Sequence, residues 1–258
     1  MTTALITGGT SGIGAAFARA YAGRGHDLVL VARDEARLAD AAAELAARHG
    51  VRVETMVADL SLRPDADRVA ARLADAAAPV EVLVNNAGFS VGATLLSEDM
   101  AKHDRAAEGM MRSVLLLQAA AGRAMRDRGH GTIVNVASVA AFVTQGHYSA
   151  IKAYVVSLTE SLAVELKGRG VRVCALCPGY VRTEFHDRAG IRGSSIPDPL
   201  WLDADALVAE CLRDVERGRV VSIPQRRWSA IAGALRVAPR PLVRTLSAAL
   251  SSARRNES

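Results

Sequence analysis

Tyr148 and Lys152, in the stretch HYSAIKAYV, are the residues whose types and spacing most directly suggest chemistry. Residues four apart share one face of a helix, so the phenol and the ammonium are expected to be neighbours. A tyrosine hydroxyl has a pKa of about 10, too high for proton transfer at neutral pH, and a nearby ammonium lowers that pKa. Only three of the 32 lysine and arginine residues are lysines, which indicates that this position needs a compact ammonium rather than a planar guanidinium.

Ser138 lies ten residues before Tyr148 and follows an apolar run, so it would lie at the end of a strand. Apolar runs that alternate with helical patterns are typical of parallel strands buried on both faces, and such sheets bind ligands at the carboxyl ends of their strands. The expected fold is α/β: one doubly wound, Rossmann-like domain with a parallel sheet of about seven strands and helices on both faces. The expected strands are 4–7, 27–32, 51–58, 80–86, 131–138, 171–177 and 219–224, with a long helix from about 97 to 128 and another from after Ser138 to about 167.

The first expected strand runs into the glycine-rich loop TGGTSGIG, residues 7–14, and then into a helical pattern. Its glycines allow a tight turn and a close approach of the backbone to a ligand. The amides at the N-terminus of the following helix favour an anion such as a pyrophosphate. The spacing is G-x-x-x-G-x-G, and a purely structural turn is the alternative. A dinucleotide site is predicted because the loop joins the first strand to the first helix.

The second expected strand ends at Arg33. An acid at this place suits the ribose 2′-hydroxyl of NAD, whereas an arginine suits the 2′-phosphate of NADP. NADP(H) is therefore the predicted cofactor, and an exposed surface charge is the alternative interpretation of Arg33. The acids that follow, Asp34 and Glu35, match the first turn of the next helix, where carboxylates are favourable.

The third and fourth expected strands also end in polar residues. Asp59 and Leu60 follow the third strand, where the adenine of a dinucleotide would lie. The motif NNAG, from Asn85 to Gly88, follows the fourth strand, and its amides and glycine allow side-chain bracing and close backbone approach. An asparagine-rich turn is the alternative interpretation of that motif.

The formal charge is +5 and the isoelectric point is about 9.5, but the excess lies in the C-terminal tail. From Arg217 onward, arginines are opposed by a single acid, Glu257. No recognition motif or aromatic–basic patch accompanies this charge, so no nucleic-acid partner is expected. The expected division is a main domain over 1–224 and a basic, amphipathic extension over 225–258. The extension could contact an anionic membrane surface or pack on protein, and its break at Pro239 and Pro241 favours packing.

The cysteines are predicted to be structural. Cys174 and Cys177 have CxxC spacing, but they lie in an apolar strand-like run without a second ligand pair, so no metal site is expected. With Cys211 the count is odd, which argues against a secreted disulfide framework. The sequence has no signal-peptide pattern at its start and no apolar stretch of about 18 residues, so a cytoplasmic location is expected.

Five motifs together resemble those of the short-chain dehydrogenase/reductase family: TGGTSGIG, NNAG, the serine after the fifth strand, YSAIK, and PGYVRT. The resemblance covers residues 3 to 183, with the motifs in order. It implies an NADPH-dependent oxidoreductase that transfers a hydride between nicotinamide and a carbonyl or alcohol substrate. The alternative is a cofactor-binding scaffold or sensor with weak or no turnover.

The resemblance also implies a role for each matching residue. Tyr148 would be the general acid, Lys152 would lower its pKa and hold the nicotinamide ribose, and Ser138 would orient the substrate carbonyl. Thr183 would touch the nicotinamide amide. The residues predicted to bind the cofactor are Gly8, Thr10, Ser11, Gly12, Ile13, Gly14, Arg33, Asp59, Leu60, Asn85, Ala87, Gly88, Tyr148, Lys152, Pro178, Gly179, Val181 and Thr183.

Two departures from the family pattern stand out. The family usually has an asparagine in the long fourth helix, where it kinks the helix and anchors a proton-relay water. The matching position here is Met110, or its neighbour Gly109 or Met111, and a thioether is only a weak acceptor. Slower or rerouted proton delivery is implied. The connection from Ser138 to Tyr148 is also shorter than is common in the family, and His147 within it is a further substrate-contact candidate.

Residues 184–205 match the family's substrate-binding region. The segment is partly aromatic and contains prolines, which suits a lid over a hydrophobic ketone or acyl compound, and packing against the core is the alternative. Its apolar and aromatic residues are Phe185, Ile191, Trp201 and Leu202, beside His186. The family resemblance further implies a homodimer or homotetramer that binds a small-molecule substrate.

Overall fold

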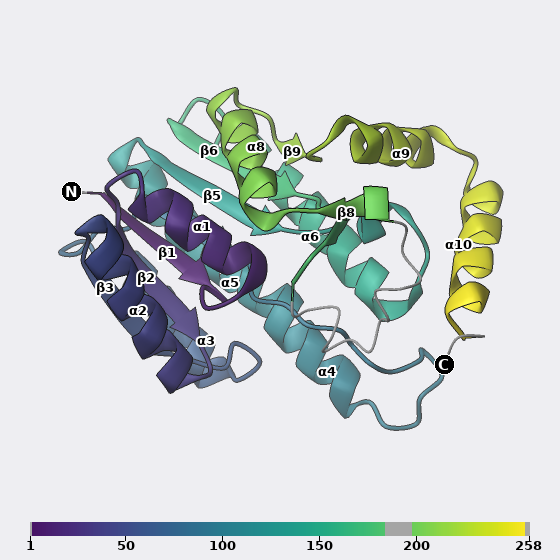
Figure 1. Cartoon of the computed structure of the whole chain (residues 1–258), viewed down its shortest axis with the longest axis horizontal. Helices are drawn as coiled ribbons and strands as arrows, with labels where there is room; N and C mark the ends of the chain where they lie inside the picture. Colours follow the sequence, from purple (N-terminus) through teal and green to yellow (C-terminus); the bar gives the residue numbers. More distant parts are fainter. Residues whose placement is uncertain (1, 184–197, 256–258) are drawn as a thin grey trace.

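The computed structural model describes residues 2–183 and 198–255. Seven parallel strands form one sheet in the order β3-β2-β1-β4-β5-β6-β9 (Figure 1). The order reverses beside β1, so the carboxyl ends of β1 and β4 flank the crevice where ligands of doubly wound sheets bind. The strands are β1 (Thr3–Thr7), β2 (Asp27–Ala32), β3 (Val53–Val57), β4 (Val82–Asn85), β5 (Gly131–Val136), β6 (Val171–Leu176) and β9 (Val221–Ser222).

Helices cover both faces of the sheet, so the predicted fold class is confirmed. Figure 1 shows α1 and α8 in front of the strands, with α5 behind them. One face carries α1 (Gly12–Ala22), α2 (Glu35–His49) and α8 (Ala204–Glu216), and the other carries α3 (Arg63–Ala74), α5 (Ser113–Arg128) and α6 (Gly146–Glu165).

The central strands are apolar throughout because successive side chains enter different cores. Ile6 and Val84 pack in the core under α1 and α8, whereas Leu5 and Leu83 pack in the core under α3 and α5. All four side chains are fully buried. The edge strand β3 is an exception to this pattern, since none of its residues is fully buried and Glu54, Thr55 and Val57 are exposed.

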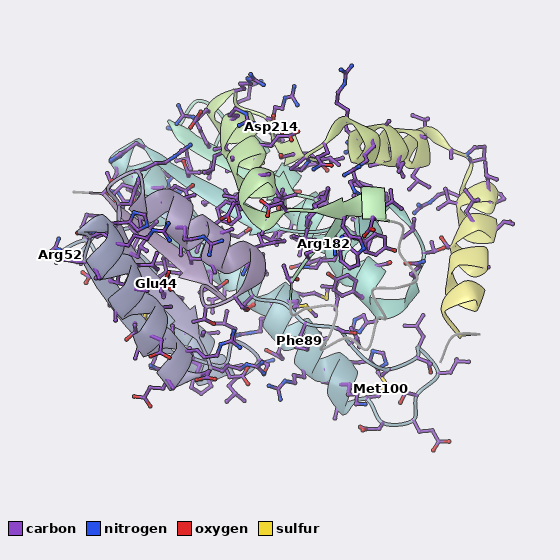
Figure 2. All side chains as sticks on the ribbon, in the orientation of Figure 1. Glu44, Arg52, Phe89, Met100, Arg182 and Asp214 are labelled. Atoms are coloured by element: carbon purple, nitrogen blue, oxygen red, sulfur yellow. The ribbon has the colours of Figure 1, made fainter. Side chains whose placement is uncertain are left out.

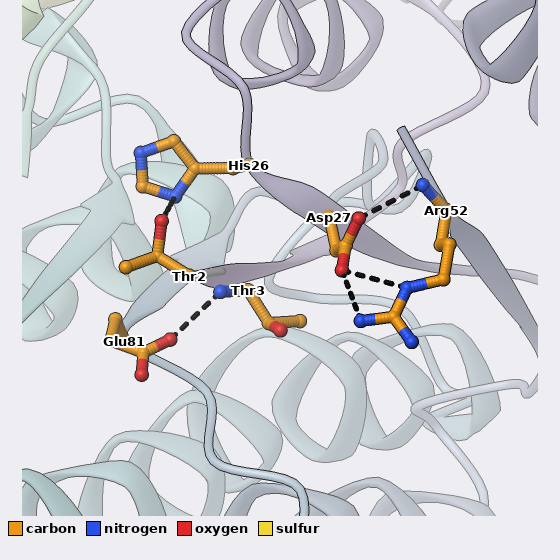
Figure 3. Close-up of polar contacts among 6 residues, drawn as sticks. All are labelled: Thr2, Thr3, His26, Asp27, Arg52 and Glu81. Atoms are coloured by element: carbon orange, nitrogen blue, oxygen red, sulfur yellow. Dashed lines mark hydrogen bonds and ion pairs between the residues drawn. The ribbon is translucent and has the colours of Figure 1, made fainter. Parts of the chain in front are cut away.

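Polar contacts hold the amino ends of β1, β2, β3 and β4 together (Figure 3). The buried Asp27 carboxylate accepts hydrogen bonds from the Arg52 backbone amide at 2.9 Å and from its guanidinium at 2.6 and 3.0 Å. These bonds hold the pKa of Asp27 below its ordinary value. Glu81 accepts from the Thr3 amide at 2.7 Å. This edge lies opposite the carboxyl ends of the strands, so it stabilises the fold without facing the predicted site.

The predicted long helix over 97–128 is interrupted. It consists of α4 (Ala101–Ala107), a π-helical turn η1 (Glu108–Arg112) and then α5. The Ser113 hydroxyl donates to the Gly109 carbonyl at 2.7 Å within this turn. A wider turn of this kind inserts a residue and redirects the helix. The helical periodicity continues through it, which explains why the sequence pattern does not reveal the interruption.

The C-terminal extension forms two helices, α9 (Arg226–Val237) and α10 (Arg240–Arg255). They are separated at Pro239, where the sequence predicts a break. Figure 1 shows them on the side of the molecule that carries β9 and α6, away from β3. Among the described residues, no helix has the length and apolar character needed to cross a bilayer.

Candidate active site

The structure brings Ser138, Tyr148 and Lys152 together at the carboxyl end of β5. Ser138 lies two residues beyond β5 and caps a short helix, η2 (Val139–Phe142), and its side chain hydrogen bonds with Tyr148. Tyr148 and Lys152 lie one turn apart on α6, with the Lys152 Nζ 5.5 Å from the centre of the tyrosine ring. Nζ donates to the Val136 carbonyl at 2.9 Å, so the ammonium is held against the strand that precedes Ser138.

Burial dominates the electrostatics of this group. It raises the pKa of Tyr148 above its ordinary value, and the hydrogen bond with Ser138 opposes that rise. Burial also lowers the pKa of Lys152 to about 8, while Cys177 acts weakly in the other direction. In this arrangement burial of the phenol outweighs any lowering of the Tyr148 pKa by the Lys152 charge, and the role of Lys152 stays a prediction. Desolvation of the phenol is the larger effect, and Ser138 is the group that favours the phenolate.

The buried Lys152 gives a testable dependence of stability on pH. Its pKa rises from about 8 in the folded chain to 10.5 when exposed, so the unfolded state binds more protons between these values. The free energy of unfolding should then increase with pH across this window by on the order of 2–3 kcal/mol. Denaturant titrations of wild type and Lys152→Met at pH values of roughly 7.5 and 10 isolate this contribution, because other groups titrate alike in both. A constant difference between the two proteins would contradict the assignment.

The glycine-rich loop forms a cradle that has no room for side chains. Gly8 and Gly12 have φ of 65° and 53°, conformations that favour glycine. A Cβ on Gly14 would lie 2.1 Å from the Gly8 carbonyl oxygen. A Cβ on Gly12 would lie 2.9 Å from Thr183 Cγ2, so Thr183 lies against this loop. Thr10, Ser11 and Ile13 complete the turn into α1 and are half-buried.

Asn86, rather than Asn85, braces the glycine loop. Its side-chain amide donates to the Thr7 and Gly8 carbonyls at 2.9 and 3.2 Å. The Thr7 hydroxyl accepts from the backbone amides of Asn86 and Ala87 at 2.9 and 3.0 Å. The Asn85 amide instead donates to Asn135 on the neighbouring strand at 2.9 Å. Sequence reasoning did not single out Asn86, although its position in NNAG, one residue beyond the buried strand, is a signal for it.

A cluster of charges lies where the second and third strands end. Asp59 accepts from the Ser61 amide and hydroxyl at 3.0 and 2.7 Å and from Arg105 at 2.7 Å. Burial acts to raise the pKa of Asp59, but the Ser61 hydrogen bonds and the charges of Arg105 and Arg33 outweigh it and hold that pKa below its ordinary value. Arg33 is exposed, whereas Leu60 is buried. Arg105 comes from α4, and no local pattern could have placed it here.

Asp34 has the role that the sequence predicts for it. It is the N-cap of α2, and its carboxylate accepts from the Arg37 backbone amide at 3.0 Å. A carboxylate engaged in this way stabilises the first turn of the helix. Arg33 is consequently the charged side chain left at the end of β2 to meet a ligand.

Met110 lies in the π-helical turn and reaches the site. It is 1 % exposed, and its Sδ accepts from the Phe89 backbone amide at 3.4 Å. A Cβ on Gly88 would lie 3.5 Å from this sulfur and 3.7 Å from Lys152 Nζ. Figure 2 shows Phe89 beside α4. The wider turn thus lies where the family usually has its asparagine, and a thioether occupies the position near Gly88 and Lys152.

A histidine pair fixes α4 to the start of α6. Nε2 of the buried His103 lies 2.9 Å from the Thr94 carbonyl, which can only accept, so Nε2 carries a proton. Nδ1 of a neutral His103 then accepts, and His147 Nδ1 donates to it across 2.8 Å. Burial is the main cause that lowers the pKa of His147, and a protonated His103 would lower it further. The pair pins the residue before Tyr148, and nothing in the sequence pattern links these two histidines.

The turn after β6, which begins at Pro178, lies next to Ser138. The Pro178 carbonyl accepts from the Val139 amide at 3.0 Å, next to Ser138. A Cβ on Gly179 would lie 2.1 Å from the indole of Trp228, so α9 packs directly on this turn. Val181 is buried in β7 (Tyr180–Val181), which pairs with β8 (Trp201–Leu202).

The described end of the predicted lid is aromatic. Tyr180 lies with its ring centre 6.0 Å from Trp201 and 5.6 Å from Trp228. Arg182 lies over Trp201 with its guanidinium carbon 5.3 Å from the ring centre, beside β8 in Figure 2. The other lid residues named from the sequence, Phe185, His186 and Ile191, lie outside the described residues.

Within residues 2–183 and 198–255, no cluster of three or more histidine, cysteine or acidic side chains could hold a metal ion. Cys174, Cys177 and Cys211 are all buried and free. Burial raises the pKa of the Cys177 thiol to about 12. Cys174 and Cys211 pack between β6 and α8, whereas Cys177 packs on the other side with Val155 and Val156 of α6.

Comparison with known proteins identifies the family. The family model described as short chain dehydrogenase matches residues 2–191. The chain belongs to the short-chain dehydrogenase/reductase family. This family consists of oxidoreductases, so the chain is an oxidoreductase of the short-chain class.

Individual family members cover most of the chain. Galactitol 2-dehydrogenase (L-tagatose-forming) from Cereibacter sphaeroides is 40% identical over 187 residues, which cover 70% of this chain and 72% of that protein. A short-chain dehydrogenase from Sphingobium yanoikuyae, solved in complex with NADPH, is 38% identical with a TM-score of 0.83 over 91% of this chain and 93% of that chain. The bulky-bulky ketone specific alcohol dehydrogenase from Comamonas testosteroni is 32% identical with a TM-score of 0.79 over 91% and 92% of the two chains.

Proposed function

We propose that this short-chain dehydrogenase/reductase is an NADPH-dependent reductase of hydrophobic ketones or acyl carbonyl compounds, which also runs in reverse on the alcohol. The observation that carries the proposal is the joint placement of Ser138, Tyr148 and Lys152. One hydroxyl, one phenol and one ammonium lie together at the carboxyl end of β5. Lys152 Nζ is 2.9 Å from the Val136 carbonyl oxygen and 5.5 Å from the centre of the Tyr148 ring.

The residues of the chain fit a dinucleotide. The loop from Gly8 to Gly14 leaves no space for a Cβ at Gly14, so its backbone can approach a pyrophosphate. Exposed Arg33 suits the 2′-phosphate, and the capping role of Asp34 keeps that carboxylate from competing. The Sphingobium relative that binds NADPH supports this choice over NAD. Thr183, beside Gly12, is the residue proposed to hold the nicotinamide end.

The chain's own side chains would then donate the proton and orient the substrate carbonyl. Bound nicotinamide supplies or accepts the hydride when the cofactor is present. The Tyr148 hydroxyl, kept neutral by burial, gives its proton to the developing alkoxide. The Ser138 hydroxyl orients the carbonyl oxygen and hydrogen bonds with Tyr148. Lys152 places positive charge beside the phenol as it loses its proton, which stabilises the phenolate transiently.

The substrate class rests on Trp201, in the described part of the lid, and on the two aromatic residues next to it. Tyr180, Trp201 and Trp228 form an aromatic cluster beside the turn after β6. A cluster of this kind favours an apolar group next to the carbonyl. The ketone-specific relative from Comamonas supports this class, whereas the galactitol relative argues for including sugar alcohols in any test.

The test is NADPH oxidation with a panel of aliphatic, aromatic and acyl-thioester ketones and a ketose, with NADPH affinity measured separately by titration. Turnover of at least one hydrophobic ketone in preference to the ketose is expected. Preference for the ketose would contradict the substrate class. Tight NADPH binding without turnover across the panel would instead favour the scaffold or sensor alternative that Met110 suggests.

A further inference from the structure

The connection between Ser138 and Tyr148 carries two of the three proposed catalytic side chains at its two ends. Its first half is held by bonds within η2, since the Ser138 carbonyl accepts from the Ala141 amide at 3.0 Å. Its second half leads into α6, where the Ser149 hydroxyl accepts from the Gln145 amide at 3.2 Å. Because the connection is short, a displacement at its middle would reach both ends.

Helix α10 holds the middle of this connection. The Ser247 hydroxyl accepts from the Thr144 backbone amide at 3.0 Å and donates to the Val243 carbonyl at 2.8 Å. Ser247 is 1 % exposed and Val243 is fully buried, so this face of α10 lies against protein. The bond joins residues 103 positions apart in the sequence.

Helix α9 holds the same region at two further places. The Arg236 guanidinium carbon lies 5.1 Å from the centre of the Phe142 ring, in η2, and Arg236 pairs with Glu160 on α6 at 3.5 Å. Trp228 packs on Gly179 and donates from Nε1 to the Leu200 carbonyl at 3.2 Å. The two helices thus contact η2, the turn after β6 and the described end of the lid.

We propose that the C-terminal arm, defined as α9 and α10, is a part of the active site, and that Ser247 is a positioning residue that holds the Ser138–Tyr148 connection through Thr144. The inference rests on the proposed function, since it assigns Ser247 to the support of those catalytic groups. The buried face with Val243 and Ser247 is used within the chain, so it is not available to a membrane surface.

Ser247→Ala tests this role, and Thr245→Ala is its matched control. Both hydroxyls donate to the carbonyl four residues earlier, at 2.8 Å for Ser247 and 3.1 Å for Thr245. Thr245 is exposed on the same helix. The two variants therefore lose the same kind of local bond, and the difference between them reports the Thr144 contact.

The expected result is a fall in kcat of roughly ten-fold for Ser247→Ala, with an unchanged NADPH dissociation constant and a larger deuterium isotope effect from labelled NADPH. Thr245→Ala should match wild type. A general loss of structure would weaken NADPH binding as well, so the split between kcat and cofactor affinity separates positioning from simple destabilisation. Equal kcat values for the two variants would overturn the proposal.

Hydrogen exchange gives a measure that does not depend on turnover. The amides of residues 139–148 should exchange faster in Ser247→Ala than in Thr245→Ala, even if no panel ketone is reduced. If Ser247→Ala does not fold, Arg236→Gln takes its place, because Arg236 pairs with Glu160. Its control is Arg226→Gln, since Arg226 is exposed on the same helix and forms no ion pair within the described residues. Unchanged exchange over 139–148 in the tested variant would overturn the role of the arm, whatever the outcome for the proposed reaction.

Discussion

Tyr148→Phe is expected to lower kcat roughly a thousand-fold while leaving NADPH affinity unchanged. The substitution removes only the hydroxyl, which is the atom proposed to give its proton to the substrate oxygen. The ring remains packed beside Met110 and Ile151, so the fold and the position of Lys152 should be retained. Initial rates with the preferred ketone, together with an NADPH titration of each protein, provide the measurement.

Tyr154→Phe is the control for this experiment. Tyr154 lies on the same helix as Tyr148 and is half-buried, but it packs toward Phe142 and the end of β6 rather than toward Met110. Its substitution should change kcat less than about two-fold. If Tyr148→Phe kept most of the wild-type rate, another group would have to deliver the proton, and the assignment of Tyr148 would be wrong.

Arg33→Ala is expected to weaken NADPH binding roughly fifty-fold while NADH binding changes little, because a charged hydrogen bond to the 2′-phosphate is lost. Because the Arg33 guanidinium is exposed at the end of β2, its loss should not affect the fold. The dissociation constants for NADPH and NADH are measured at one ionic strength, and their ratio in Arg33→Ala is compared with that in wild type.

Arg48→Ala, near the other end of α2, removes the same charge at an exposed position. It should leave the ratio of the two dissociation constants unchanged. An equal loss of NADH and NADPH affinity in Arg33→Ala would show that Arg33 supports the site generally rather than binding the phosphate. No loss of either would leave Arg105, the other arginine at this edge, as the group to test.

The fold follows from the sequence because its signals are local. The run LVLVA, residues 28–32, is apolar at every position, as expected for a strand with both faces covered, and the structure places it between β1 and β3. The spacing of Tyr148 and Lys152 could be interpreted in the same way, since helical geometry alone puts residues four apart on one face. Asp34 was assigned to a helix cap for an equally local reason, its place just before the first helical turn.

Other features depended on residues that meet only after folding. Arg105 reaches Asp59 across 46 positions, and His103 reaches His147 across 44. The choice of Asn86 over Asn85 as the brace of the glycine loop depends on which way each side chain leaves the strand end. The balance of pKa effects at Tyr148 also required the structure, because desolvation depends on the packing around a group and not on its neighbours in sequence.

The sequence by itself determined the seven strands of the main sheet, the sheet class, the glycine-rich loop and the pairing of Tyr148 with Lys152, because periodicity and spacing along one element are enough to specify each of them. It did not reveal the short pair β7 and β8, which joins residues about twenty positions apart. The tertiary structure alone decided that a π-helical turn places Met110 beside Lys152, and that Ser247 holds the segment between Ser138 and Tyr148. These contacts join elements far apart in the chain, and the free energy that selects them comes from packing that no local pattern encodes.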